Sequence, residues 1–223
     1  MLGGAVGDAL GFVIGKDDLK TIHKKYGPYG LRTVLKSAKN GNKSIISDDT
    51  QLSLFTADGM LWADHDGLEP TEGLYRSYMR WYYTQTERII RPEQEKWMNR
   101  QDHEVDLEYD MMGEQALFAR RSPGKTCLTA LASGKKLSRD ETLNHSSGNS
   151  TVMRAAPIGL FYEGDPEMAF FVGSQAASLT HGNPKAFLST ATISAIIASL
   201  AVGKDISTAL GGALHILQRD PEG

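Results

Sequence analysis

The sequence predicts an all-α fold, a compact and irregular multi-helix bundle that forms one domain. Most segments of ten or more residues repeat their apolar side chains every three or four positions, which is the period of an amphipathic helix. Strict two-residue alternation, the pattern of a half-buried strand, is hard to find in any part of the chain. With 223 residues, of which 40% are hydrophobic and 23% charged, the chain can bury the core of one ordinary domain.

The apolar periodicity predicts ten helices, with expected ranges 2–13, 18–25, 49–64, 71–86, 110–120, 126–133, 151–162, 166–179, 184–202 and 205–217. Residues typical of helix starts precede four of them, namely Ser47-Asp48, Asp165, Asn183 and Asp205. Proline follows Asp165 and Asn183, as is common at the first helical position. Residues 87–109 carry mixed charges without a sustained apolar period, so we expect a mobile loop or an insertion there.

Charge, cysteine content and hydropathy exclude several classes of protein. The 24 basic and 27 acidic residues give a net charge of −3, and no long cationic stripe is seen, so nucleic acid is not expected as a partner. Cys127 is the only cysteine, which excludes an intrachain disulfide and fits a cytoplasmic location. No uncharged apolar run reaches the roughly 18 residues that span a bilayer, so no membrane partner is expected. A phosphate-binding loop at 123–126 is excluded because Ala119 replaces its first glycine.

The first motif that could take part in catalysis or metal binding is Ser47-Asp48-Asp49, which places a hydroxyl and two carboxylates at an expected helix start. Oxygen ligands of this kind suit Mg²⁺, Mn²⁺ or Ca²⁺ better than zinc, and a cation would relieve the repulsion between adjacent carboxylates. Helix capping explains the same residues, because acidic and hydroxyl side chains suit the positive end of a helix. A single acid in the apolar N-terminal helix, Asp8, is costly to bury unless it is bonded, so we expect it to anchor a polar network near the site.

Two further motifs could hold a ligand. Gly148, Asn149, Ser150 and Thr151 lead into an expected helix, where free N–H groups and hydroxyls could bind a diphosphate, although a plain loop with an N-cap would use the same residues. His181 lies in a turn between two apolar helices. It could contact a ligand, but a histidine in such a turn is more often a structural residue.

Four motifs occur together in this order: GDALG at 7–11, SDDTQ at 47–51, GNSTVMRAAPIG at 148–159 and THGNPKA at 180–186. In combination they resemble the ADP-ribosylglycohydrolase family, in its bacterial type. The resemblance implies an all-α fold with two Mg²⁺ or Mn²⁺ ions at the floor of a cleft that binds ADP-ribose. It implies Ser47, Asp48 and Asp49 as metal ligands, the two aspartates also being catalytic. By the same comparison 148–151 would face the diphosphate and distal ribose, and His181 the adenosine end.

Three positions depart from the family pattern. The family supplies further metal ligands from a late D-x-D-T/S segment, and no such segment occurs in residues 1–223, so we expect the domain to be C-terminally truncated. Gly15 stands where family members commonly carry a glutamate, and Asp17 or Asp18 are candidates to replace it. Ser150-Thr151 stand where small residues are favoured, which predicts a narrower phosphate pocket.

The resemblance therefore predicts a divalent-metal-dependent hydrolase that removes ADP-ribose from modified protein side chains. The alternative is a catalytically weak or inactive protein on the same scaffold, which binds ADP-ribose or neutralises an ADP-ribosylating toxin. A third hypothesis is that the chain is an inert fragment. The expected partners are accordingly ADP-ribosylated protein or ADP-ribose, with a toxin as the partner under the alternative.

Overall fold

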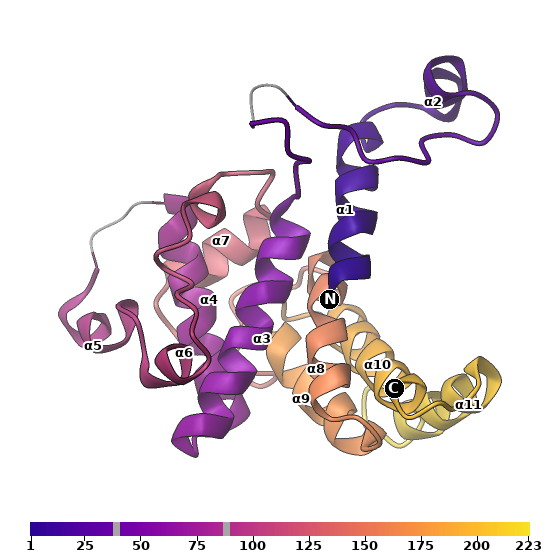
Figure 1. Ribbon diagram of the computed structural model, residues 1–223. Coiled ribbons are helices and arrows are strands. Elements are labelled where there is room, and N and C mark those ends of the chain that lie inside the picture. Colours follow the sequence, from indigo (N-terminus) through magenta and orange to yellow (C-terminus); the bar gives the residue numbers. More distant parts are fainter. Residues whose placement is uncertain (38–40, 87–89) are drawn as a thin grey trace.

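The computed structural model describes residues 1–37, 41–86 and 90–223, and in this part of the chain the fold is all-α, as predicted (Figure 1). Apart from one isolated bridge between Ser37 and Lys43, its regular structure is helical. The α-helices are α1 (Leu2–Ile14), α2 (Leu19–Tyr26), α3 (Asp48–Asp66), α4 (Pro70–Thr86), α5 (Glu95–Met98), α6 (Asp102–Asp106), α7 (Lys125–Ala132), α8 (Ala155–Phe161), α9 (Pro166–Ser178), α10 (Pro184–Ala201) and α11 (Ile206–Leu217). Short 3₁₀ helices are η2 (Pro92–Gln94), η3 (Gln115–Phe118) and η4 (Asn149–Arg154).

The predicted helix starts are confirmed by their capping bonds. The side chains of Asp165, Asn183 and Asp205 accept hydrogen bonds from backbone N–H groups in the first turns of α9, α10 and α11. Each bond satisfies a donor that the helix itself leaves free. The local sequence thus determines where these helices begin.

The first half of the core is a close pair of helices, α3 and α4. A Cβ atom at Gly59 or at Gly73 would overlap the backbone of the facing helix, so only glycine permits this approach. Around the contact the aromatic side chains of Phe55, Tyr78 and Trp81 are fully buried. Their large apolar surfaces make a substantial contribution to the hydrophobic stabilisation on this side of the molecule.

The second half of the core surrounds α10, which packs against α8, α9 and α11 (Figure 1). Most of its buried residues are small, and among them Ala191, Ser194 and Ala198 are completely buried. Helix α10 is long and apolar enough to cross a membrane by length and composition alone. Half of that stretch is buried inside the protein, which is the environment of a core helix.

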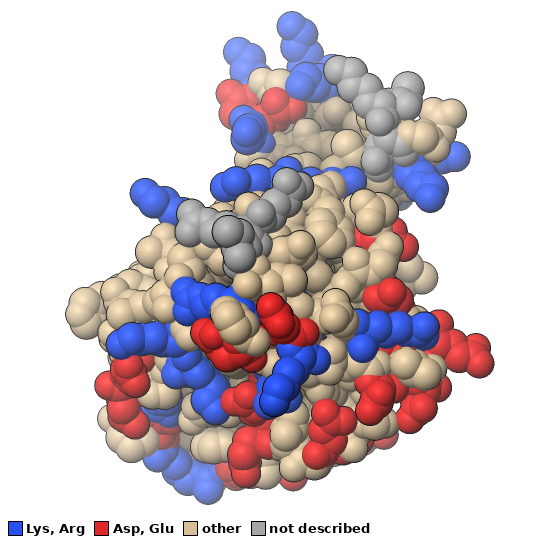
Figure 2. Space-filling model, turned by 90° about the vertical axis from the view of Figure 1, so that its left-hand side faces the viewer, with Lys and Arg blue, Asp and Glu red and all other residues tan. Residues whose placement is uncertain are grey.

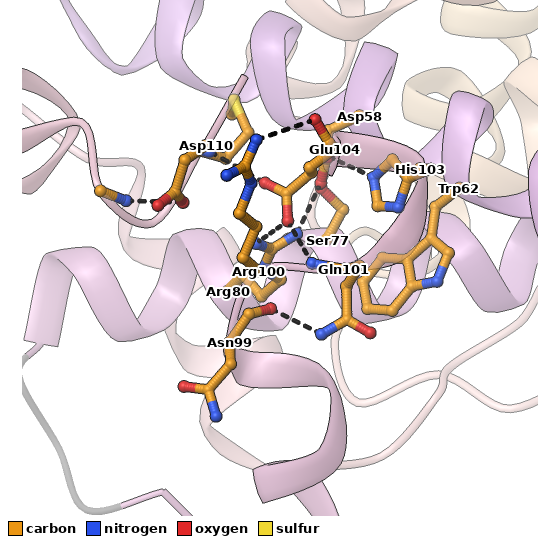
Figure 3. A network of polar contacts seen from close by, with 12 residues as sticks. Asp58, Trp62, Ser77, Arg80, Asn99, Arg100, Gln101, His103, Glu104 and Asp110 are labelled. Atoms are coloured by element: carbon orange, nitrogen blue, oxygen red, sulfur yellow. Dashed lines mark hydrogen bonds and ion pairs between the residues drawn. The ribbon is translucent and has the colours of Figure 1, made fainter. Parts of the chain in front are cut away.

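Residues 87–120 differ from the prediction. A loop was expected at 87–109, but its described part contains η2, α5 and α6; a helix was expected at 110–120, but only η3 at 115–118 forms. The physical reason is a buried polar network that tertiary contacts alone create (Figure 3).

In this network Arg80 of α4 donates to Asp58 Oδ2 of α3 (3.3 Å) and to Glu104 Oε2 of α6 (2.7 Å). His103 Nε2 donates to Asp58 Oδ1 (2.8 Å), and the His103 ring stacks on Trp62 at 5.2 Å between centroids (Figure 3). Glu104 also accepts a bond from the backbone N–H of Met111 (2.9 Å). These hydrogen bonds and ion pairs hold residues 101–111 against α3 and α4, although the segment lacks the apolar repeat of an amphipathic helix.

The N-terminal helix lies apart from this core. Helix α1 leans on the start of α3, and Ala9 is its only buried residue. Beyond it, α2 and the adjoining loops project from the top of the molecule in Figure 1. No described residue between Lys16 and Lys43 is buried.

Candidate functional site

The candidate site begins at the N-terminus of α3. Ser47 is the N-cap residue, and its Oγ accepts a hydrogen bond from the backbone N–H of Asp49 (3.1 Å). The backbone N–H of Asp48 donates to the carbonyl oxygen of Arg121 (3.1 Å). The capping interpretation of Ser47 is therefore confirmed, and the same geometry leaves both carboxylates at the positive end of the helix.

Asp8 of α1 supplies a third carboxylate to this helix end. Its Oδ2 accepts hydrogen bonds from Ser47 N (2.8 Å), Thr50 N (3.3 Å) and Thr50 Oγ1 (2.6 Å). The expectation that Asp8 anchors a polar network near the site is confirmed. Because these donors belong to the first turn of α3, Asp8 fixes α1 against the segment that carries the candidate ligands.

The electrostatics of the site favour a cation. Asp48 is buried, and burial, with the charges of Asp49 and Asp8 added, raises the pKa of its carboxyl to about 6, although Gly124 N donates to its Oδ2 (3.1 Å). Partial desolvation and the charge of Asp8 also raise the pKa of Asp49. In the described part of the chain no basic side chain forms an ion pair with these three acids. A bound cation would compensate the unbalanced negative charge.

The available donors fit one side of a site for a hard cation. Ser47, Asp48 and Asp49 offer only oxygen atoms, which is the donor type that Mg²⁺ and Mn²⁺ prefer. The Asp49 carboxylate accepts no hydrogen bond from the described residues, and its exposed side chain borders a cleft. Within the described ranges no three His, Cys, Asp or Glu side chains lie close enough together to hold a metal ion by themselves. Further ligands from water, substrate or another acidic segment are needed to complete the coordination.

The cleft runs between α1 and the start of α3 and has a volume of about 1030 Å³. One wall is the glycine-rich face of α1, where Gly4, Gly7, Gly11 and Gly15 leave the backbone accessible. The opposite wall includes Ser47, Asp49, Asn149, Met153 and Ala156. A cleft of this size with a few polar groups at one wall can enclose a ligand as large as a dinucleotide.

The segment 148–151 contributes one side chain to the cleft. Asn149 lines it, whereas Ser150 Oγ bonds to His181 Nε2 (3.2 Å) and Thr151 Oγ1 donates to the carbonyl oxygen of Ala186 (3.1 Å). The hydroxyls of Ser150 and Thr151 are therefore engaged away from the cleft. Neither side chain lines the cleft, and the narrower phosphate pocket stays a prediction.

His181 lies behind this segment and is completely buried. Its Nδ1 bonds to Thr180 Oγ1 (2.9 Å), which accepts a hydrogen bond from Arg154 (2.7 Å). Burial, and next the charge of Arg154, lower the pKa of His181 to about 4, so the ring is neutral near pH 7. Its observed contacts position Ser150; a direct contact with ligand stays a prediction.

Some residues of the site could not be found from motifs. Gly124 bonds the buried carboxylate of Asp48, yet its Pro-Gly-Lys-Thr context suggests only an incomplete phosphate loop. Neither candidate for the missing glutamate at Gly15 occupies the cleft. Asp17 pairs with Lys25 (2.8 Å), and Asp18 accepts a capping bond from Thr21 N (2.7 Å).

Comparison with known protein families gives a match over almost the whole chain. The family model for ADP-ribosylglycohydrolase matches residues 1–222, a range that contains α1, the carboxylates of α3, η4 and the whole cleft. No curated protein matches the chain.

Proposed function

Because the chain belongs to the ADP-ribosylglycohydrolase family and is a glycoside hydrolase of that type, we propose that it removes ADP-ribose from modified protein side chains with a divalent cation, Mg²⁺ or Mn²⁺. One observation carries the metal dependence. Asp49 lines a large cleft and Asp48 is buried next to it in α3; both carboxyls have raised pKa values, and no described basic side chain forms an ion pair with either. We place the reaction in the cytoplasm, for which the single reduced Cys127 is the supporting feature.

Ser47, Asp48 and Asp49 would hold the cation. When bound, such a cation orients the ribose hydroxyls and lowers the pKa of a water molecule close to the anomeric carbon. Asp49, the more exposed of the two carboxylates, can accept the proton of the attacking water. The negative charges of Asp8 and Asp48 favour the positive charge that develops on the sugar in an oxocarbenium-like transition state.

The remaining residues of the cleft would bind the nucleotide. The Asn149 amide can donate to a phosphate or ribose oxygen, and the bare backbone along α1 lets a flat base or a sugar approach closely. Apolar side chains such as Phe12 and Met153 exclude water from the bound ligand. His181 would contribute indirectly, because its hydrogen bond to Ser150 positions the segment that carries Asn149.

A second function has specific support. The described donors form only one side of a cation site, and Gly15 cannot provide the carboxylate that its position commonly carries in the family. Both features favour a protein that binds ADP-ribose on the same scaffold without turnover. Nothing in the cleft favours a toxin over ADP-ribose as the partner.

Two measurements test the proposal. Calorimetric titration of Mn²⁺ and Mg²⁺ compares the protein with Asp48→Asn, Asp49→Asn and the control Asp64→Asn, an exposed acid near the other end of α3. We expect the first two substitutions to weaken cation binding at least tenfold and the control to leave it unchanged. Equal binding by all four proteins would refute the metal assignment.

The second measurement is release of free ADP-ribose from an ADP-ribosylated protein, with cation or with chelator. Release that depends on the cation supports the hydrolase. Binding of ADP-ribose without any release, under conditions in which the cation is bound, would replace it with the non-catalytic function.

A further inference from the structure

The segment between α1 and α3, residues 16–43, carries a charge opposite to that of the rest of the chain. We call it the basic arm. It contains eight of the 24 basic residues and two of the 27 acidic residues, a net charge of +6. The other 195 residues contain 16 basic and 25 acidic residues, a net charge of −9. The small overall charge of −3 is therefore the sum of two large and separate contributions.

Six of the eight basic residues of the arm are available to a partner, since Lys25 pairs with Asp17 and Lys39 lies outside the described residues. Its exposed cations include Lys16, Lys20, Lys24, Arg32, Lys36 and Lys43, and none of these six forms an ion pair with a described residue. Both acids of the arm are already engaged, Asp17 with Lys25 and Asp18 as the cap of α2. In Figure 2 most of the charged side chains on the lobe at the top of the molecule are blue, whereas blue and red side chains are interspersed on the lower body.

The position of the basic arm connects it to the cleft. It follows Gly15, which lines the cleft at the end of α1, and it returns to Ser47, which lines the opposite wall. Both ends of the arm thus lie at the cleft, so a protein whose side chain reaches into the cleft can also contact the arm. Two apolar side chains, Leu19 (67% exposed) and Tyr29 (83% exposed), add contact area of the kind found in protein interfaces.

We propose that the basic arm is a docking surface for an acidic protein surface that surrounds the ADP-ribosylated side chain. The proposal rests on the proposed function, because binding of ADP-ribose in the cleft is what brings the modified protein into contact with the arm. Complementary charge would raise the rate of association and select substrates by the residues around the modified position.

An acidic protein fits the basic arm better than a nucleic acid does. A nucleic acid is long and uniformly anionic, so beyond the arm it would meet the net negative body. Only one of the eight basic residues, Arg32, is an arginine, the side chain that binds phosphate in a bidentate manner. A patch of a few carboxylates on a folded protein can contact the arm alone.

The test compares two variants with equal loss of charge. Lys20→Gln/Lys24→Gln/Lys36→Gln removes three cations of the basic arm, and Lys96→Gln/Lys185→Gln/Lys204→Gln removes three exposed lysines of the body. The probes are twelve-residue fluorescent peptides with one central ADP-ribosylated serine, flanked either by glutamates or by glutamines. Binding is measured by anisotropy in the presence of chelator, so that it does not depend on turnover.

We expect the arm variant to bind the glutamate peptide about tenfold more weakly than the unaltered protein and the body variant at 50 mM salt, and this difference to shrink below about threefold at 0.5 M salt. Binding of the glutamine peptide should be equal in all three proteins. Equal affinity of the three proteins for the glutamate peptide would overturn the proposal.

A parallel titration with a duplex and a single-stranded 20-nucleotide DNA covers the other polyanion. Tighter binding of either DNA than of the glutamate peptide, lost in the arm variant alone, would overturn the proposal in favour of a nucleic-acid surface. The two hypotheses fail separately. Arm-dependent binding of the glutamate peptide without release of ADP-ribose contradicts only the hydrolase, whereas release that is the same for both peptides and both variants contradicts only the docking surface.

Discussion

Replacement of Asp8 by alanine should release α1 from the body without unfolding the core. Asp8 Oδ2 accepts three hydrogen bonds from Ser47 and Thr50, and apart from Ala9 the helix buries no side chain. The carboxylate is thus the principal tie between α1 and α3. The Asp8→Ala variant separates this local tie from the global stability of the protein.

The size of the effect follows from the bonds that are lost. Hydrogen bonds to a charged acceptor contribute about 1.5–3 kcal/mol each, but the site is only partly buried, so water replaces part of this. A loss of about 3 kcal/mol for the set corresponds to a roughly hundredfold larger population of the open form of α1. The core around α4 and α10 loses no contact, and its stability should change by less than about 1 kcal/mol.

Hydrogen exchange measured by mass spectrometry provides the assay, because it reports local opening peptide by peptide. Amides of residues 2–14 and of the first turn of α3 should exchange about a hundredfold faster in Asp8→Ala, while those of α10 keep their rate. The control is Asp18→Ala, which removes the cap of α2 and should affect that helix only. Unchanged exchange in α1, or an equal loss of protection in α10, would refute the reasoning.

Three further substitutions test other contacts. Burial, and next the charge of Arg154, lower the pKa of His181 to about 4, so the ring stays neutral in the folded protein but binds a proton on unfolding below about pH 6.5. The free energy of unfolding should therefore fall by up to about 3 kcal/mol as the pH drops from 6.5 to 4. The His181→Gln variant should lack this part of the pH dependence in urea titrations. Arg80→Met leaves the buried carboxylates of Asp58 and Glu104 without the arginine and should lower the free energy of unfolding by about 3–5 kcal/mol. A decrease of less than about 1 kcal/mol would contradict this prediction. Gly73→Ala overlaps the backbone of α3 and should cost about 2–3 kcal/mol in thermal or urea unfolding, whereas Gly212→Ala, in open space on α11, should be neutral or slightly stabilising.

Helices with strong local signals could be predicted from the sequence almost to the residue. Helices α9, α10 and α11 combine an apolar period with an Asp or Asn cap, and their observed starts agree with the prediction to within one residue. These signals are local, since a cap and the N–H groups it satisfies lie within three positions of each other. No knowledge of the tertiary fold is needed to find them.

The segment 87–120 could not be predicted because its structure depends on distant partners. His103 and Glu104 look like surface residues in a charged stretch, yet both are buried against Asp58 and Arg80, about 20 to 45 positions away in the chain. Pattern analysis treats charged residues as exposed, which is the common case. A buried ion pair contradicts this assumption. The backbone N–H of Met111 also bonds the Glu104 carboxylate, so the start of the segment 110–120 belongs to the same network.

The candidate site was predicted in part. Ser47, Asp49 and Asn149 lie in one cleft, as the order of motifs suggested, and Asp8 joins them. Motifs do not indicate where a side chain points, so they could not show that the Thr151 hydroxyl donates to the carbonyl oxygen of Ala186 in the interior rather than lining the cleft. Motif spacing predicts which segments meet, while the orientation of each side chain depends on its hydrogen-bond partners.

The basic arm shows why a sum over the whole chain is a poor guide to electrostatic partners. A net charge of −3 suggests weak attraction to any polyion, yet it combines +6 in residues 16–43 with −9 elsewhere. At physiological ionic strength charges more than about 8 Å apart are largely screened from one another, so a partner at the arm experiences the local positive charge and little of the distant negative charge. An acidic surface can therefore be attracted to the arm although the protein as a whole is negative. For the same reason the attraction must weaken as salt is added, and a docking affinity that does not change between 50 mM and 0.5 M salt could not arise from these lysines.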